Sequence, residues 1–254
     1  MRAHTYNSNL LKGTGAVSET ISLLSIYDRD TTKKSLLDYV LSTNFLSTNT
    51  EKRARDIVEK VFFNRYMQHN HLVPYWLRLT REKGLMVNQL SQLLYVYTLR
   101  ENAILYDYVI KVLNPVKASG ANYIPKSKAD EFIKELNDNG TLEWSSTSQV
   151  RMGQHMRGTL VDFNVIDLNG NILPFEANDF TVLYLMHELH FGGLSDIAIW
   201  EHEDWGLFNM DKYDVLQRIM NLSLKSGFIA QNSGDLLTIS WKYNSMEEMI
   251  NATL

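Results

Sequence analysis

The apolar positions along residues 17–113 recur with the period of an α-helix. Val17, Ile21 and Leu24 stand at i, i+4 and i+7, a spacing that places them on one helical face. Thr48 and Glu51 have the spacing of a capping box for the next helix, TNTEKRARDIVEKVFFNRYM. The apolar residues of that stretch form the stripe of a core-facing helix; they are Ala54, Ile57, Val58, Val61 and Phe62. The pattern predicts a helical N-terminal region.

Residues 87–113 keep the helical period but are apolar on almost every side, which is typical of a central, buried helix. Asn114-Pro115 follows, and the residue before a proline is pushed out of the α region. We therefore expect this helix to end at Asn114.

A second helical unit is predicted over residues 116–175. In PKSKADEFIKELNDNG, Ser127 is placed to cap a short helix and Asn139-Gly140 to stop it. Residues 145–163, SSTSQVRMGQHMRGTLVDF, predict the next helix. In NVIDLNGNILPF, Asn169-Gly170 separates two short apolar runs, a strong hairpin signal. Helix, turn, helix and hairpin is the order of a winged helix-turn-helix.

Residues 176–254 repeat this order. We expect helices over residues 180–190, over LSDIAIW and over MDKYDVLQRIMNLSLKSG. The main apolar positions of the third helix are Val215, Ile219, Leu222 and Leu224. GFIAQNSGDLLTISW then pairs two apolar runs across Asn232-Ser233-Gly234, which predicts a second hairpin.

Charge is distributed unevenly along the chain. The formal net charge of −4 argues against nucleic acid, but residues 1–165 hold 21 Lys and Arg against 16 Asp and Glu, whereas residues 166–254 hold 4 against 13. A polyanion would be repelled by the second part and accepted by the first. We therefore expect any DNA surface to lie before residue 166.

The whole pattern predicts a mainly α fold with three parts. These are a helical N-terminal domain (residues 1–115), a central helix-turn-helix-like module (116–175) and an acidic C-terminal winged-helix-like module (176–254), the last two with short β-hairpin wings. The chain lacks cysteine, which excludes a disulfide framework and a thiolate zinc site and favours a reducing, cytoplasmic compartment. The longest uncharged run, residues 84–99, is shorter than the about 20 apolar residues of a spanning helix, so we expect no membrane contact.

The helix over residues 145–163 carries the best candidate for DNA contact. On a wheel of about 100° per residue, Met152, Gly153, Met156, Leu160 and Phe163 gather on one side. The opposite side holds polar residues able to reach base edges or phosphates. The N-terminus of the helix has free N–H groups that favour a phosphate, and the start of the preceding helix adds two lysines. The candidate DNA-binding residues are Lys126, Lys128, Ser146, Thr147, Arg151, Gln154 and His155, with Arg157 on a flank. Gly158 on the same side would let the backbone approach another surface closely. The alternative is an ordinary solvated face with an N-cap.

Two other basic clusters are weaker candidates. Lys52, Arg53 and Arg55, with Lys60 and Arg65 on the same helix, form a possible second patch. Glu51–Arg55 and Asp56–Lys60 stand at i, i+4, however, so mutual pairing on a solvated face is favoured. The third helix of the last module offers Lys212, Gln217, Arg218, Asn221 and Lys225. Asp211, Asp214 and the nearby WEHEDW oppose a polyanion there, which favours protein binding or packing.

Nothing in the sequence supports catalysis, a metal or a cofactor. HELH places His187 and His190 at i, i+3 rather than the i, i+4 of a zincin helix; a metal site there would also need His202 and Glu203. KGTG at residues 12–15 lacks the preceding strand and the ending of a phosphate-binding P-loop.

Three stretches resemble the BrxA family of BREX phage-defence systems. LLKGTGAVSETISLL at residues 10–24 is similar to the family's lysine-glycine pair, short spacer and glutamate in the first helix. TNTEKRARDIVEKVFFNRY is similar to its threonine-then-arginine helix that ends in an arginine, and EWSSTSQVRMGQHMRGTLVDFNVI to its tryptophan, Ser-Thr and basic amphipathic helix. The chain departs from the family at Met152-Gly153, where lysines are common, and in a C-terminal module that is longer than in short members.

The resemblance implies an all-helical, non-enzymatic, DNA-binding component that acts beside a methyltransferase and ATPases of the same defence system. Together with the residues it favours weak, salt-sensitive and largely sequence-independent binding of double-stranded DNA. Two alternatives stay open. One is a protein–protein adaptor that uses the acidic C-terminal module, and the other is a winged-helix transcriptional regulator, which usually needs a dimer and two related half-sites.

Overall fold

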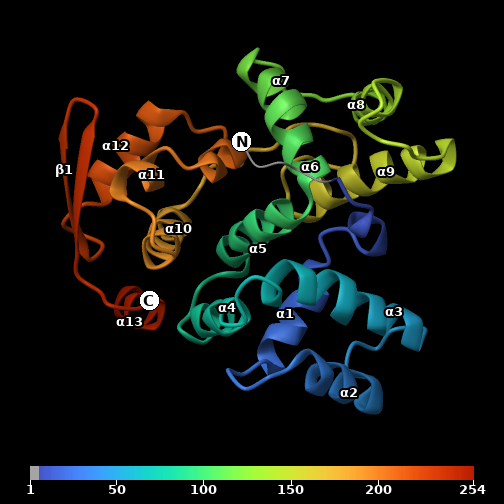
Figure 1. Cartoon of the computed structure of the whole chain (residues 1–254), viewed down its shortest axis with the longest axis horizontal. Coiled ribbons are helices and arrows are strands. Elements are labelled where there is room, and N and C mark those ends of the chain that lie inside the picture. Colours follow the sequence, from blue (N-terminus) through green and yellow to red (C-terminus); the bar gives the residue numbers. More distant parts are fainter. Residues whose placement is uncertain (1–5) are drawn as a thin grey trace. The chain divides into compact units, whose positions relative to one another are not determined.

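The computed structural model describes residues 6–254 and confirms a mainly helical fold with a small antiparallel hairpin (Figure 1). The chain forms two compact units. Unit 1 contains the residues up to Tyr75 together with Leu94–Phe175, and unit 2 contains Trp76–Leu93 together with Glu176–Leu254. The N-terminal helices and the 116–175 region therefore share one unit, while residues 76–93 join the C-terminal region.

Unit 1 is helical except for short bridges. Its helices are the 3-10 helix η1 (Asn9–Lys12), α1 (Val17–Ile26), α2 (Lys33–Thr43), α3 (Glu51–Arg55), the π-helix η2 (Asp56–Met67), the second half of α5 (Val87–Glu101), α6 (Ala103–Tyr108), the π-helix η3 (Val109–Leu113), α7 (Asn114–Ala118), α8 (Ser127–Asp138) and α9 (Ser146–Asp162). The predicted stripe from Ala54 to Phe62 is buried. The predicted capping box is wrong, because Thr50 caps α3 by accepting a hydrogen bond from the Arg53 N–H at 3.2 Å.

The long apolar run over residues 87–113 does not end at Asn114. It breaks earlier, at Asn102, whose backbone leaves the helical region (φ −114°, ψ 79°). Helical structure then continues through Pro115 to Ala118. Pro115 stands in the first turn of α7, where the hydrogen-bond pattern changes from the π-helix η3 to an α-helix.

Helices α8 and α9 pack against each other and lead into a small hairpin. Ser127 does not cap α8: Lys126 occupies the position before the helix with helical torsions, and no side chain caps it. The hairpin over residues 166–172 is confirmed by an antiparallel bridge between Ile166 and Ile172. At its turn, the Asp167 carboxylate accepts hydrogen bonds of 2.8 Å from three successive N–H groups, those of residues 169, 170 and 171.

Unit 2 is built around α10 (Asp179–Phe191), which is buried on nearly all sides and packs against α11 (Asp196–Trp200), α12 (Lys212–Leu222) and α13 (Met246–Thr253). The unit also contains α4 (Val73–Glu82, from Trp76 on), the first half of α5 and the 3-10 helix η4 (Glu203–Phe208). Strands β1 (Phe228–Ser233) and β2 (Leu236–Trp241) form the predicted hairpin at the edge of the unit (Figure 1).

Two details of this unit differ from the expectation. The strands extend further than predicted, pairing from Phe228↔Trp241 to Ser233↔Leu236, so the turn is Gly234-Asp235. Leu224 is not a core position, because α12 ends at Leu222 and the Leu224 side chain is 78% exposed.

Among residues 6–254, none of the helices combines the length and the apolar character needed to cross a bilayer.

Candidate nucleic-acid interface

Helix α9 has one buried and one partly open face, as its sequence predicts. Met152, Met156 and Leu160 are fully buried. Gly153 lies on the same side, where an added Cβ would overlap the Asp130 carboxylate of α8. The absence of a side chain at Gly153 therefore permits α8 and α9 to cross closely.

The N-terminal half of the other face is open to solvent. Ser145 caps α9 by accepting a hydrogen bond from the Ser148 N–H at 3.3 Å. The side chains of Ser146 and Thr147 in the first turn are exposed, as are those of Arg151 and Gln154. The first N–H groups of a helix have no partner within it, so this end combines open backbone donors, hydroxyls and a cation.

The start of α8 contributes one open cation. Lys126 is exposed, while Lys128 forms an ion pair of 2.8 Å with Glu131 of its own helix. The hydrogen bond from Lys128 holds the pKa of the Glu131 carboxyl below its ordinary value. Both residues are surface-exposed, so the ion pair between them is only weakly stabilising.

The C-terminal half of the same α9 face is covered by residues 6–16, which we call the N-terminal strap. The His155 ring Nδ1 lies 3.1 Å from the Leu10 carbonyl oxygen. Gly158 faces Thr14, with 3.2 Å between an added Cβ and the Thr14 methyl carbon. Asp162 accepts a hydrogen bond of 2.7 Å from the Gly15 N–H. The close approach expected at Gly158 is therefore made by the protein's own chain.

Arg65 of η2 holds the other side of the strap. Its guanidinium donates to the carbonyl oxygens of Gly13, Thr14 and Gly15 at 2.9, 2.7 and 3.0 Å. Arg65 is only 5% exposed, so its predicted place in a surface basic patch is wrong. Burial lowers the pKa of Arg65. The side chain compensates for lost hydration by donating to three carbonyls. The KGTG loop thus turns its carbonyl oxygens toward a cation rather than its N–H groups toward a phosphate.

The burial of Arg65 was detectable in the sequence. Arg65 follows Val61 by four residues and Phe62 by three, so it continues the apolar stripe of the helix. What spacing could not supply was the partner, because residues 13–15 lie about 50 positions away.

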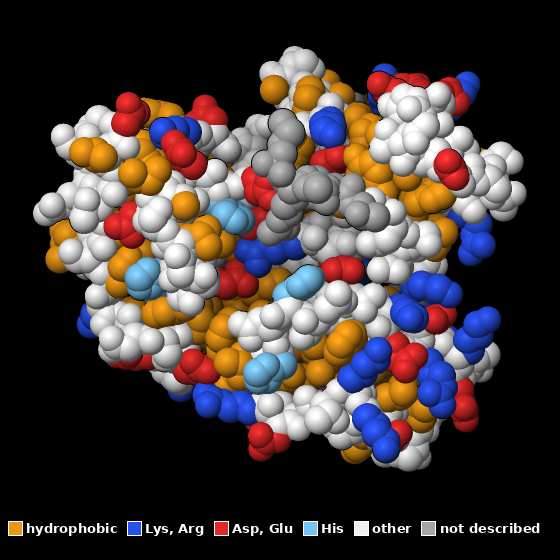
Figure 2. Space-filling model, in the orientation of Figure 1, with side chains coloured by type: hydrophobic (Ala, Val, Ile, Leu, Met, Phe, Trp, Pro, Cys, Tyr) orange, Lys and Arg blue, Asp and Glu red, His pale blue; other side chains and the backbone are white. Residues whose placement is uncertain are grey.

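The rest of the second basic patch is only partly open. Arg53 donates from Nη1 to the Lys12 carbonyl oxygen at 2.5 Å, and Asp56, expected to pair with Lys60, lies 3.7 Å from Lys12 Nζ. Lys52 and Arg55 are exposed. Figure 2 shows Lys and Arg side chains mixed with acidic ones over the region of α2 and α3, which is the appearance of a solvated face of mixed charge.

Arg157, predicted on the flank of the DNA-facing side, is half-buried and turned toward the hairpin. Its Nη1 is inaccessible to water and has no hydrogen-bond partner among the described residues. An added Cβ at Gly170 would lie 3.7 Å from this nitrogen. Burial raises the pKa of the neighbouring Tyr108, and the charge of Arg157 partly opposes that rise.

In unit 2, the cations of α12 are paired within the unit. Lys212 Nζ lies 2.6 Å from a Glu201 carboxylate oxygen and 3.9 Å from Asp235, and the hydrogen bond with Glu201 raises the pKa of Lys212. Arg218 donates to the Ala177 carbonyl oxygen at 2.5 Å and lies 3.1 Å from Asp179. Of the other polar residues predicted on this helix and just after it, Gln217, Asn221 and Lys225 are exposed.

The HELH histidines take part in an aromatic cluster. His187 is fully buried, its Nδ1 lies 2.9 Å from the Leu183 carbonyl oxygen, and its ring packs edge-on against Trp241. His190 stacks on the same indole with ring centroids 4.2 Å apart. His202 lies 3.2 Å from Asp204 and caps η4. No cluster of three or more His, Asp or Glu suited to a metal ion occurs within residues 6–254.

Fold and site together define a mainly helical, two-unit protein whose candidate functional face is the open N-terminal half of α9. The BrxA family model matches residues 4–188, and the chain belongs to the BrxA family. The crystal structure of an uncharacterized protein from Magnetospirillum magneticum is similar in fold, with a TM-score of 0.60 and 13% identity over 74% of this chain and 95% of that one. No curated protein matches.

Proposed function

We propose that this BrxA-family protein is a non-enzymatic, DNA-binding component of a BREX-type anti-phage defence system. The observation that carries the proposal is the open half-face of α9. Arg151 and Gln154 project from it beside the exposed hydroxyls of Ser146 and Thr147. Arginine and glutamine are side chains that reach base edges in the major groove, and a helix N-terminus favours a phosphate.

The arrangement around α9 supports a winged-helix mode of docking. A bridge between Tyr123 and Asn171 joins the segment before α8 to the hairpin after α9. Helix, short strand, two helices and a hairpin is the order in which winged helices present a recognition helix and a wing. In such modules the second helix of the pair enters the major groove.

Contacts with DNA would be few, so binding is expected to be weak. Lys126, Ser146 and Thr147 are the candidates for phosphate contact, and Arg151 with Gln154 for the groove. We leave His155 out of the groove contact because Leu10 engages its ring, and Arg157 because its guanidinium is turned toward the hairpin. With so few open cations, affinity should depend on salt and little on sequence.

The test is a titration of the full chain with a fluorescent duplex of about 20 base pairs, compared among three variants. Arg151→Ala with Gln154→Ala should weaken binding about tenfold. Lys34→Ala removes another exposed cation of the same unit as the matched control, and Arg55→Ala tests the second basic patch. Unchanged affinity in the α9 variant, with loss in Arg55→Ala, would move the interface to α3.

A second candidate function is a protein–protein adaptor that uses unit 2. The observation that favours it is the pairing of Lys212 and Arg218 with acidic groups of their own unit, which leaves α12 without an electropositive face. Other proteins of the same defence system are the expected partners. Deletion of residues 176–254 is not a clean test, because Trp76 donates to Glu247 at 3.0 Å and Gln92 accepts from the Asn178 side chain at 2.6 Å within the unit.

A further inference from the structure

Unit 2 carries a concentration of exposed apolar side chains. Of the thirteen large hydrophobic residues that are exposed in the described part of the chain, five fall between residues 213 and 236. They are Tyr213 (67% exposed), Met220 (39%), Leu224 (78%), Ile229 (47%) and Leu236 (64%). Single exposed apolar residues need no explanation, whereas a contiguous group marks an interaction site.

Two of these residues lie on the same side of α12. Tyr213 and Met220 stand at i and i+7, about 20° apart on a helical wheel, and Leu224 follows the end of the helix. The buried residues of α12, Val215 and Ile219, lie on the opposite side. The outward side of the helix therefore carries Tyr213 and Met220, with the exposed Gln217 between them at about 40° from Tyr213.

The hairpin runs beside this helix and is bonded to both of its ends. At the start of α12, Lys212 Nζ lies 3.9 Å from Asp235, the residue before Leu236. At its end, the Leu224 N–H donates to the Phe228 carbonyl oxygen at 2.9 Å, next to Ile229. These two contacts place Leu236 and Ile229 on segments that neighbour the ends of α12, and we call the five exposed side chains the α12 surface.

Leu224 is held on this surface at a conformational cost. Its φ of +69° lies in the left-handed region, which a branched side chain rarely adopts. A glycine would suit this position, yet it carries an apolar side chain that is 78% exposed. Residues kept in such conformations cluster at functional sites.

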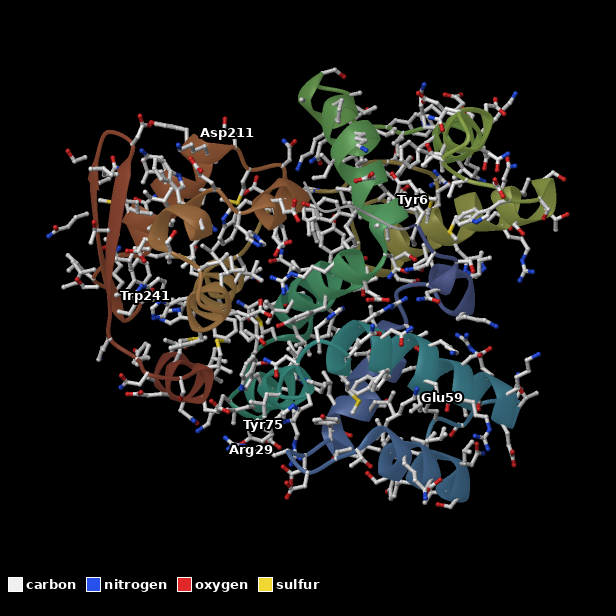
Figure 3. All side chains as sticks on the ribbon, in the orientation of Figure 1. Tyr6, Arg29, Glu59, Tyr75, Asp211 and Trp241 are labelled. Carbon is white, nitrogen blue, oxygen red and sulfur yellow. The ribbon has the colours of Figure 1, made fainter. Side chains whose placement is uncertain are left out.

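The charge around the α12 surface selects the kind of partner. Unit 2 holds 7 Lys and Arg against 13 Asp and Glu, a net charge of −6. Asp211 and Asp214 are exposed at the start of α12, which Figure 3 marks at Asp211, and the side chain of Asp235 is fully exposed. Lys212 is already paired with Glu201. This field repels a nucleic acid and a like-charged copy of the same face, and attracts a cationic segment.

We propose that the α12 surface docks a basic amphipathic helix of another protein. Such a helix lays its apolar side chains on Tyr213, Met220 and Leu224, while lysines or arginines at its margin meet Asp211, Asp214 and Asp235. This inference gives the adaptor candidate a surface and a partner class, and it is independent of DNA binding by α9.

The test uses the full chain and two labelled peptides of about 18 residues, long enough to become helical on binding. One peptide has a leucine face flanked by lysines, and the other replaces each lysine with glutamate. Leu224→Gly combined with Tyr213→Ala removes two apolar contacts, and glycine relieves the left-handed strain at position 224. Asp235→Lys reverses a charge, and Leu168→Ala, 79% exposed in unit 1, is the matched control.

We expect the lysine peptide to bind the wild-type chain, the glutamate peptide to bind at least about tenfold more weakly, and hydrogen exchange to slow in α12. The double variant and Asp235→Lys should each weaken binding by about tenfold, with Leu168→Ala unchanged. Equal binding of both peptides, or protection away from α12, would overturn the proposal. So would a dimer of the wild-type chain that the double variant abolishes, since the occupant would then be a second copy. Duplex affinity in these variants stays at the wild-type value, which separates failure here from failure of the α9 interface.

Discussion

Asp162 accepts a hydrogen bond from the backbone N–H of Gly15, a residue 147 positions earlier in the chain, at 2.7 Å. The contact joins the last turn of α9 to the N-terminal strap, which Arg65 grips from the opposite side. The three stretches that resemble the BrxA family therefore meet at one place. There the first two stretches hold the C-terminal half of α9, the helix of the third stretch, whose open N-terminal half is the candidate DNA contact.

Arg65→Met should destabilise unit 1 by about 3–5 kcal/mol, because three carbonyl oxygens of the strap lose the donor that they share. Urea unfolding followed by far-UV circular dichroism measures the change. Arg55→Met is the control, since Arg55 is exposed, and it should stay within about 0.5 kcal/mol of wild type. Equal losses of stability in the two variants would show that the hydrogen bonds from Arg65 to the N-terminal strap make no specific contribution.

Two glycine substitutions should have different effects on the free energy of unfolding. An added Cβ at Gly15 would lie 2.5 Å from the Asp162 Cβ, so Gly15→Ala should cost about 1–3 kcal/mol. Gly158→Ala meets only the Thr14 methyl at 3.2 Å and gains helix propensity, so it should be neutral or stabilising by up to about 1 kcal/mol. Denaturant midpoints compare the two. A larger loss in Gly158→Ala would mean that the strap cannot yield at Thr14.

Arg157→Met should leave DNA affinity nearly unchanged while Arg151→Ala lowers it. The Arg157 Nη1 is buried and unpartnered, and an apolar chain of similar length avoids that desolvation, so stability should be unchanged or rise by about 1 kcal/mol. Duplex titration and urea unfolding of both variants check the two readouts. If Arg157→Met loses as much affinity as Arg151→Ala, the guanidinium of Arg157 does contact DNA.

The duplex affinity should also fall with salt in proportion to the few phosphate contacts. Between about 50 and 200 mM salt the affinity of the wild-type chain should fall along a shallow logarithmic slope, on the order of −1 to −2, because Lys126 and Arg151 are the cations placed on DNA. Lys126→Ala should reduce that slope by about 1, because it removes one phosphate contact. An affinity indifferent to salt would be incompatible with the electrostatic mechanism.

Acid should destabilise unit 2 through His187. Burial lowers the pKa of His187 from its ordinary value of 6.5 to about 4, since the folded unit accommodates the neutral ring. Above pH 6.5 the ring is neutral in both states and does not affect the free energy of unfolding. As the pH falls from 6.5 toward 4, the unfolded chain binds the proton first, and stability declines by about 2 kcal/mol at pH 5.

Tryptophan fluorescence reports this change well, because four of the five tryptophans lie in unit 2. His187→Leu should flatten the pH dependence between 6.5 and 4, whereas His71→Gln, at an exposed histidine, should retain it. Identical pH profiles in all three proteins would assign the acid sensitivity to other groups.

The spacing of apolar and turn residues predicted those features of the fold that depend on the local sequence. The faces of α9 follow from the spacing of Met152, Met156 and Leu160, and the hairpins follow from their turn residues. The effect of Pro115 was misjudged because it depends on where the proline stands in the helix. Here it stands in the first turn of α7, directly after a π-helix. Likewise, Ser127 has the chemistry of a cap but follows a residue whose torsions are already helical.

The sequence predicted which residues of α9 are polar and open at the candidate site, but not how much of that face is covered by other parts of the chain. Arg151 and Gln154 are open, as the wheel indicates, but nothing near His155 in the sequence announces that Leu10 engages its ring. Contacts made by a chain segment more than a hundred residues away depend on tertiary packing. A wheel therefore identifies which side of a helix is polar, and only the fold determines how much of that side remains free.

The assignment of residues 76–93 to unit 2 has a consequence for synthesis of the chain on the ribosome. These residues emerge before unit 1 is complete, yet the residues with which they pack, from Glu176 on, emerge only after roughly 80 more have been added. At about 5–20 residues per second, α4 waits for several seconds with its apolar side uncovered. A pause or truncation within that interval leaves an apolar nascent segment exposed, and such segments are prone to aggregate unless chaperones cover them.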